Sequence, residues 1–246
     1  MATDPREMPF LDHLEELRRR LITCFLAILI FSIAGYFFAD GILEFLTRPV
    51  DEVYFMGITE AFAVKIKVAL LFGLFLSVPL IFFQLWRFVA PGLYAREIRM
   101  VLPVVAGMSF FFLGGALFCF YAVLPLGIKF LLGFGTAKMK PLLSVEKYIS
   151  FVGWMTVAFG AVFQLPVVTF ILGRLGLVDA AMLRHGRRYA VVGILIVAAV
   201  ATPSPDVFSQ LLLAGPLYSL YELSIILVAV SGKKKGIATP GAVSDG

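Results

Sequence analysis

Two carboxylates followed by three arginines are the residues near the start of the chain best suited to binding chemistry. Glu15 and Glu16 precede Arg18, Arg19 and Arg20. Each acid is followed four residues later by an arginine, which is the favourable order for an ion pair on a helix. One interpretation is therefore a set of surface ion pairs. The other is a carboxylate available to a cationic partner, because carboxylates bind guanidinium groups through paired, charge-assisted hydrogen bonds.

A further carboxylate, Glu97, precedes a long apolar segment and follows a short stretch rich in aromatic residues. An acid in the first turn of a helix interacts favourably with the helix dipole, so helix capping is one interpretation. Trp86, Phe88 and Tyr94 belong to the same stretch, and an aromatic belt at a membrane interface also explains them. Aromatic rings beside a carboxylate equally suit a guanidinium, which stacks on a ring while it binds the acid.

Two polar residues, Gln164 and Glu222, lie inside apolar segments. A carboxylate within a membrane span costs a few kcal/mol to insert, so a functional role is expected for Glu222, with snorkelling to the interface as the alternative. Gln164 is neutral and suits a hydrogen bond between helices. Prolines in the same segments free backbone carbonyls and bend helices, which predicts a concave wall. These prolines are Pro79, Pro103, Pro166 and Pro216.

The sequence contains none of the patterns GxxxxGK[ST], HExxH or GxSxG, so neither a nucleotide site nor a hydrolase site is expected. Cys24 and Cys119 each lie alone in an apolar run, which favours inert buried thiols over a disulfide or a metal site. We therefore expect no enzymatic activity, no cofactor and no metal.

Membrane-spanning helices are the elements expected to position these groups. Hydrophobic residues make up 61% of the 246 residues, against roughly 45–50% in soluble domains. Apolar stretches of about 20 residues cross a hydrocarbon core of ~30 Å. We expect an all-α polytopic membrane protein with kinked helices in a concave bundle: one integral membrane domain over residues 1–235 and a disordered tail over 236–246. The predicted spans are residues 21–39, 62–85, 100–124, 148–172, 189–202 and 207–230, with loops at 40–60 and 125–147.

Positive charges alternate between the two sides of the predicted spans. Fourteen Lys and Arg residues fall on the side of the termini and seven on the other. This bias predicts that both termini are cytoplasmic. Because the basic residues lie at span ends, they match anionic lipid headgroups, and the net charge of +5 does not indicate a nucleic-acid partner.

The fifth span is short, since fourteen residues of helix reach only about 21 Å. One interpretation is that the helix extends back through Arg187, whose side chain reaches the interface. The other is a local thinning of the membrane that a translocating chain can exploit.

Three motifs in this order resemble the TatC family. They are FLDHLEELRRR at residues 10–20, FQLWRFVAPGLYARE at 83–97 and TPSPDVFSQ at 202–210. The resemblance covers about residues 8–230. It implies a receptor subunit of the twin-arginine translocase in the prokaryotic cytoplasmic (inner) membrane, which exports folded proteins with the proton-motive force. The implied partners are twin-arginine signal peptides, single-span TatA and TatB proteins, membrane lipid and further copies of the chain.

The resemblance also implies roles for individual residues. Glu16 and Glu97 would hold the two arginines of the signal peptide. The last two spans would offer the edge on which partner proteins dock, and Gln164 stands where many members carry Glu. Arg18, Phe88, Leu93 and Tyr94 would shape the signal-peptide site, and Pro49 and Asp206 would serve the outer cap and assembly.

Two other functions are compatible with a polytopic membrane protein. An ion-coupled secondary transporter would use Gln164 and Glu222 on its path, although the chain lacks the inverted repeat common in such proteins. A membrane scaffold that organises other proteins is the third interpretation.

Overall fold

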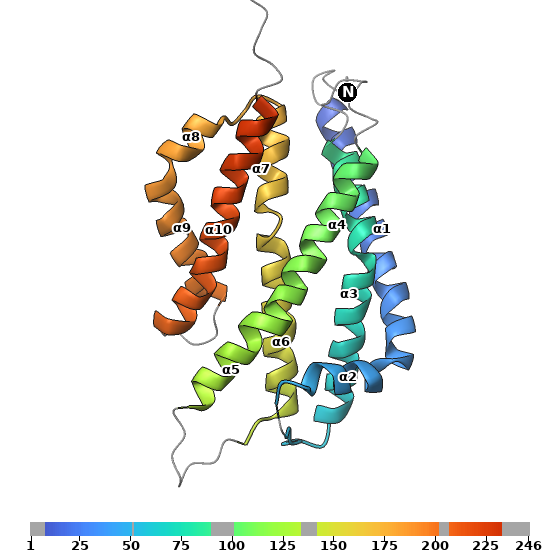
Figure 1. The fold of residues 1–246 in the computed structure, drawn as a ribbon. Helices are drawn as coiled ribbons and strands as arrows, with labels where there is room; N and C mark the ends of the chain where they lie inside the picture. The colour runs from blue at the N-terminus through green and yellow to red at the C-terminus, as the bar shows by residue number, and fades with distance from the viewer. Residues whose placement is uncertain (1–7, 51, 90–100, 134–141, 202–206, 233–246) are drawn as a thin grey trace, which may run out of the picture. The chain divides into compact units, whose positions relative to one another are not determined.

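The computed structural model describes residues 8–50, 52–89, 101–133, 142–201 and 207–232 (Figure 1). Within these ranges the regular structure is helical, apart from one isolated β-bridge between Tyr54 and Ser144. This confirms the prediction of an all-α protein. Contacts divide the chain into two compact units, Met1–Val162 and Phe163–Gly246, each described by itself below. A single domain over residues 1–235 remains a prediction, and the tail at 236–246 lies outside the described residues.

The long helix α3 is the centre of the first unit. It packs against α1, α2, α4 and α6, and α4 also packs against α6 (Figure 1). These contacts bury apolar side chains of α3 such as Val64 and Val68, which are fully inaccessible. The elements of this unit are α1 (Met8–Phe37), α2 (Ala39–Thr47), α3 (Glu60–Val89), α4 (Val101–Phe118), the π-helical turn η3 (Cys119–Val123), α5 (Leu124–Leu132) and α6 (Val145–Val162).

Two segments expected to be loops are partly helical, which corrects the predictions for 40–60 and 125–147. α2 occupies Ala39–Thr47 and crosses one end of α3, where it buries Ala39 and Leu46 (Figure 1). α5 occupies Leu124–Leu132 and extends the predicted third span. The charges of Asp40 and Glu44 hid the amphipathic pattern of α2, because a hydropathy-based reading separates spans from loops and overlooks short interfacial helices.

The transition between α4 and α5 is a π-helical turn with a local cause. The N–H of Leu124 donates to the carbonyl of Cys119, a bond between residues five apart. Pro125 follows and has no N–H to donate, so one backbone hydrogen bond of the regular α-helical pattern is missing there. Single π-turns of this kind occur inside α-helices and often mark functional positions.

The second unit is built around α10. It contains α7 (Leu165–Arg174), α8 (Ala180–His185), α9 (Arg187–Ala201) and α10 (Val207–Gly232), and α10 packs against each of the other three. Gly176, at a φ of 76°, lets α7 end tightly, with the N–H of Leu177 bonded to the carbonyl of Leu172. Asp179 then caps α8 by accepting from the N–H of Met182 at 2.6 Å.

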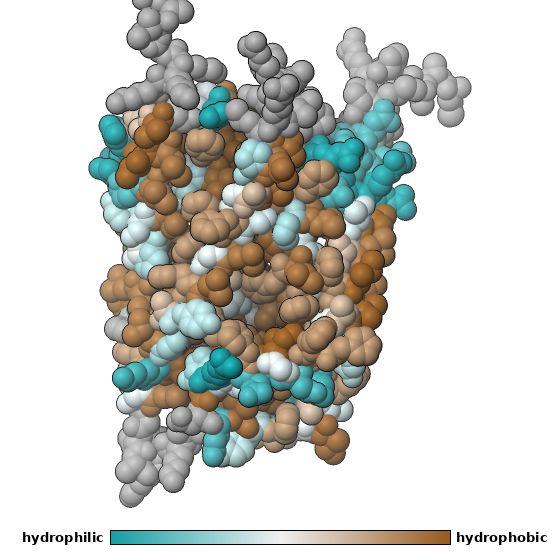
Figure 2. Space-filling model, turned by 45° about the vertical axis from the view of Figure 1, so that its right-hand side comes forward, coloured by the Kyte–Doolittle hydropathy of each residue, from teal (hydrophilic) through white to brown (hydrophobic). Residues whose placement is uncertain are grey.

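Five helical segments are long and apolar enough to cross a membrane: Asp12–Phe37, Glu60–Phe88, Val101–Leu132, Val145–Arg174 and Gln210–Val230. They match five of the predicted spans, although the fourth is interrupted between α6 and α7, just before Pro166. Apolar side chains cover the middle of the face shown in Figure 2, with polar side chains towards both ends. The chain is therefore a multispan membrane protein.

The fifth predicted span corresponds to α9, which is too short to be counted with these five. α9 begins at Arg187, as one of the two interpretations expected. Its 15 residues extend about 22 Å, well below the ~30 Å of a hydrocarbon core. Membrane thinning around this helix remains a prediction.

Glycine allows α1 and α3 to pack closely. A methyl group built on Gly73 would lie 2.1 Å from the Ser32 hydroxyl, 2.6 Å from the Ser32 nitrogen and 2.7 Å from the Ile28 carbonyl oxygen. Two of these neighbours are backbone atoms of α1, so no side-chain rotation could make room for the methyl group.

We expect Gly73→Ala to destabilise the protein by about 1–3 kcal/mol, because α1 must move away from α3 to admit the methyl group. Thermal loss of the helical circular dichroism signal in detergent measures the effect as a lower midpoint. Gly107→Ala is the matched control, since a methyl group there meets no atom within 4 Å and alanine is the better helix former. Equal midpoints for the two variants would contradict the packing argument.

Candidate functional site

Glu16 lies where α1 meets the C-terminal part of α3. The Arg20 guanidinium, one turn further along α1, donates to a Glu16 carboxylate oxygen through Nε at 3.1 Å and also through Nη2. The same guanidinium donates through Nη1 to the backbone carbonyl of Gln84 on α3 at 3.3 Å. Arg20 therefore holds Glu16 and joins the two helices.

An aromatic contact completes this cluster. The imidazole of His13 stacks on the ring of Phe88, with ring centres 4.3 Å apart and planes 16° from parallel. His13 Nδ1 also lies 3.9 Å from the second oxygen of Glu16. The sequence resemblance assigned Glu16 and Phe88 to one site. In the structure His13 lies beside both of them and links them.

Glu16 and its neighbour Glu15 differ in their surroundings, although both form the predicted ion pair with an arginine four residues on. The Glu15–Arg19 pair spans 3.9 Å between side chains that are 71% and 82% exposed, so solvent screens it. Arg20 is only 15% exposed, whereas Glu16 keeps 35% of its side chain accessible. Glu16 is thus held in position and remains open to an incoming cation.

The structure describes only some of the other residues predicted for this site. Arg18 is exposed on α1 beside the cluster. Leu93, Tyr94 and Glu97 lie outside the described residues. A shared pocket for Glu16 and Glu97 therefore stays a prediction.

At the opposite end of α3, a buried carboxylate binds two segments together, and sequence analysis did not single it out. Glu60 is only 5% exposed and is the first residue of α3. One carboxylate oxygen accepts from the hydroxyl of Ser144 at 2.5 Å and from the N–H of Glu146 at 3.0 Å. The other accepts from the N–H groups of Met56 and Gly57, the latter at 3.0 Å.

Further contacts make this end a tied cap. The N–H of Tyr54 donates to the carbonyl of Leu143 at 2.8 Å, and the N–H of Val145 donates to the carbonyl of Tyr54 at 3.0 Å. Lys67 pairs with Glu146 at 2.7 Å. The segment after α2 is thereby joined to the segment before α6. Pro49 is half-buried in the turn that enters this cap.

Local sequence could not have identified Glu60 as a link between two segments, because two of its four partners, Ser144 and Glu146, lie more than 80 residues away. An acid at the start of an apolar helix resembles any residue that caps a helix dipole. The sequence does place Glu60 between a glycine-containing turn and a long span. That position does not distinguish a buried acid from an exposed one.

In the second unit the intramembrane polar residues have different surroundings. Glu222 on α10 accepts from Arg187, the first residue of α9, at 2.7 Å. Gln164 is buried at the N-cap of α7, two residues before Pro166. Gln210 on α10 donates to the carbonyl of Leu195 at 2.9 Å, so the helix pair α9–α10 has polar ties at two levels. Asp206 lies outside the described residues.

The chemistry available to these groups is ionic recognition. Among the described residues no cluster of His, Cys, Asp and Glu is arranged to hold a metal ion. At the Glu16 cluster, a half-exposed carboxylate beside two aromatic rings can bind a guanidinium by paired hydrogen bonds and by stacking.

Comparison with known proteins identifies relatives along nearly the whole chain. The family model of the Sec-independent protein translocase protein (TatC) matches residues 12–216. The Sec-independent protein translocase protein TatC of Desulforapulum autotrophicum is 40% identical over 242 residues, covering 96% of this chain and 89% of that protein. The Aquifex aeolicus protein of the same name is 39% identical over 236 residues, covering 93% and 98%.

A solved structure agrees with these sequence matches. The crystal structure of the twin-arginine translocase receptor TatC superposes with a TM-score of 0.78 at 39% sequence identity. The match covers 89% of this chain and 99% of that one. A second crystal structure of the same receptor, in a detergent, gives the same TM-score at 40% identity, with 87% and 98% covered.

We expect Glu60→Ala to loosen the cap at its own end of α3. Four donors lose their common acceptor, and three of them are the backbone amides of Met56, Gly57 and Glu146. Hydrogen exchange followed by mass spectrometry should show these amides exchanging roughly 3- to 10-fold faster, the effect expected of a lost hydrogen bond.

Glu44→Ala is the control for this measurement, because Glu44 is exposed on neighbouring α2. Exchange at Gly57 and Glu146 should then stay as in the wild type. Unchanged exchange in Glu60→Ala would show that Glu60 does not hold the cap.

Proposed function

Because the chain belongs to the TatC family, we propose that it is the signal-peptide receptor and core subunit of a twin-arginine translocase. In this role it exports folded proteins across the cytoplasmic membrane with the proton-motive force and has no enzymatic activity of its own. The observation that carries the proposal is the Glu16 cluster, a carboxylate held in position in the N-terminal part of α1 and still 35% exposed.

The proposed topology has six membrane helices, with α9 as the short fifth one, and both termini in the cytoplasm. The distribution of Lys and Arg supports this orientation. The Glu16 cluster then faces the cytoplasm, where export substrates are made, and the Glu60 cap faces outward.

The chemistry of the cluster suits an arginine pair better than a lysine pair. Glu16 would hold one signal-peptide arginine and Glu97 the other, each through two parallel hydrogen bonds. Phe88 and Tyr94 would offer rings for stacking, while Arg18 and Leu93 would shape the site. Lysine is a poorer ligand here, because an ammonium group lacks the planar fork of donors.

Arg20 gives this site a defined resting state. Its guanidinium already binds Glu16 in the way that an incoming arginine would. In our proposal the signal-peptide arginine shares or replaces this contact, while the bond from Arg20 to the Gln84 carbonyl keeps α1 against α3. The carboxylate is therefore never left without a cation.

We also propose partners with which the chain assembles. TatA- and TatB-type single-span proteins would dock along α9 and α10, with Gln164 as a hydrogen-bonding contact near them. Pro49 and Asp206 would support the outer cap and assembly, and the chain would also contact lipid and further copies of itself. The ion pair of Glu222 with Arg187 supports a structural role for this acid over a transported-ion site.

Binding of a signal peptide to the detergent-solubilised full-length protein tests the proposal. We expect Glu16→Ala, and separately Glu97→Ala, to weaken binding of a twin-arginine peptide by roughly 10- to 100-fold, the cost of a lost charged hydrogen bond. Photo-crosslinking of a labelled peptide, titrated by concentration, measures the change. Replacing both peptide arginines with lysine should weaken binding to the wild type in the same direction.

The control is Glu15→Ala, which removes a neighbouring carboxylate that forms only an exposed ion pair. This variant should bind the peptide like the wild type. The site assignment is wrong if Glu15→Ala and Glu16→Ala weaken binding equally, or if both Glu16→Ala and Glu97→Ala bind and export normally.

A further inference from the structure

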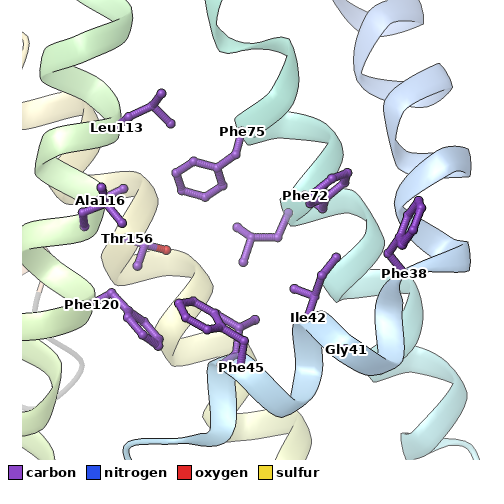
Figure 3. A pocket seen from close by; sticks show the side chains of 13 residues that line it. Phe38, Gly41, Ile42, Phe45, Phe72, Phe75, Leu113, Ala116, Phe120 and Thr156 are labelled. Carbon is purple, nitrogen blue, oxygen red and sulfur yellow. The ribbon is translucent and has the colours of Figure 1, made fainter.

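A cavity of about 620 Å³ lies within the first unit, among α2, α3, α4, η3 and α6. Figure 3 shows Phe45 and Phe120 next to each other at its α2 end, and Leu113 and Phe75 at its other end. The rings of Phe45 and Phe120 are stacked with centres 4.7 Å apart. The cavity falls in the size range of small-molecule and lipid sites, roughly 300–1,000 Å³.

The residues that line the cavity offer no unbonded polar group to a ligand. Their one hydroxyl, on Thr156, donates to the carbonyl of Val152 at 2.8 Å and so is already bonded within α6. An apolar cavity of this kind does not hold ordered water. Left empty, its walls would lose the dispersion contacts that a filling group supplies.

The cavity lining includes exposed side chains on a helical segment that is long and apolar enough to cross a membrane. Leu113 and Leu117 belong to a helical segment long and apolar enough to span a bilayer, yet they are 40% and 54% exposed. Phe38, on the opposite side of the lining, is 65% exposed. Lipid chains therefore have direct access to the space.

The packing around the cavity favours a single acyl chain over a helix of a partner protein. Among the lining helices, α3 packs directly against α2, α4 and α6. A helix with side chains is about 10–12 Å across, so it could enter the space between them only if these helices separated. A flexible hydrocarbon chain adapts to an irregular space without such a movement.

A positive charge lies at the α2 end of the cavity. The guanidinium of Arg48 lies 5.4 Å from the centre of the Phe45 ring, which is part of the lining. Arg48 is exposed, and within the described part of the chain no carboxylate pairs with it. By contrast, Lys65 and Lys67 at this end of α3 are neutralised by Asp40 and Glu146.

We propose that the cavity binds one acyl chain of an anionic phospholipid whose phosphate group binds Arg48. The lipid belongs to the leaflet that meets α2. Arginine suits this role, because its planar donors match a phosphate and its face stacks on Phe45 at the same time. The acyl chain supplies the hydrocarbon contacts with the cavity, and the guanidinium of Arg48 selects an anionic headgroup.

The test uses full-length protein in bilayer nanodiscs that contain phosphatidylglycerol or phosphatidylcholine, each with a photoactivatable diazirine on one acyl chain. Mass spectrometry of the cross-linked peptides locates the lipid. In the wild type we expect several-fold more labelling of α2 and η3 by phosphatidylglycerol than by phosphatidylcholine.

Two variants distinguish binding of the lipid acyl chain from binding of the lipid headgroup. Gly41→Leu adds a side chain at a lining position where a methyl group meets no atom within 4 Å, so it should reduce labelling by both lipids several-fold. Arg48→Gln should abolish the preference for phosphatidylglycerol while labelling by phosphatidylcholine persists. Because Arg48 is exposed, this variant keeps the test valid if Gly41→Leu fails to fold.

Each variant has a matched control. Gly114→Leu makes the same substitution on α4 at a position with equal open space outside the cavity lining. Lys129→Gln removes an exposed positive charge from α5. Both should label like the wild type.

Three results would overturn the proposal: equal labelling of the wild type by the two lipids, full labelling in Gly41→Leu, or an Arg48→Gln variant that still prefers phosphatidylglycerol. Adducts of a photoreactive residue at position 41 with a neighbouring membrane protein, in place of lipid, would also overturn it.

Discussion

A charged or hydrogen-bonding group beside the hydrocarbon layer must find its partner within the protein, because lipid chains offer none. The two ends of α3 follow from this constraint. At its first residue, Glu60 receives four donors from two other segments. Towards its last turn, Arg20 of α1 bonds to the Gln84 carbonyl and to Glu16. α3 is therefore fixed at both ends by a carboxylate, directly or through an arginine.

The two carboxylates differ in what they leave accessible. Glu60 is 5% exposed, and its carboxylate oxygens accept hydrogen bonds from nearby backbone N–H groups and from Ser144. It therefore has a structural role. Glu16 is bound by the side chain of Arg20, lies near that of His13 and keeps about a third of its surface exposed, so another cation can reach it. A receptor needs both kinds of residue, one that keeps the frame rigid and one whose partner can be exchanged.

Prediction from sequence succeeded for features that depend on residues close together in the chain or on the summed hydropathy of a segment. The helical class and five of the spans follow from long apolar runs, and the pairs Glu15–Arg19 and Glu16–Arg20 follow from a spacing of four residues. It failed at α2, where Asp40 and Glu44 within nine residues concealed a helix that packs on α3. A short interfacial helix has too little apolar length to stand out, and its stability comes mainly from tertiary packing.

The sequence by itself determined that the chain crosses a membrane, how its basic residues are distributed among the ends of the spans, and which motifs assign it to its family, because these properties are carried by residue type and order. The tertiary structure alone decided that Glu60 meets Ser144 and Glu146, that His13 stacks on Phe88, and that a cavity opens between α2 and η3. These contacts join residues distant in the chain. They depend on the path of the backbone and on the fit of neighbouring helices, and no local pattern encodes either one.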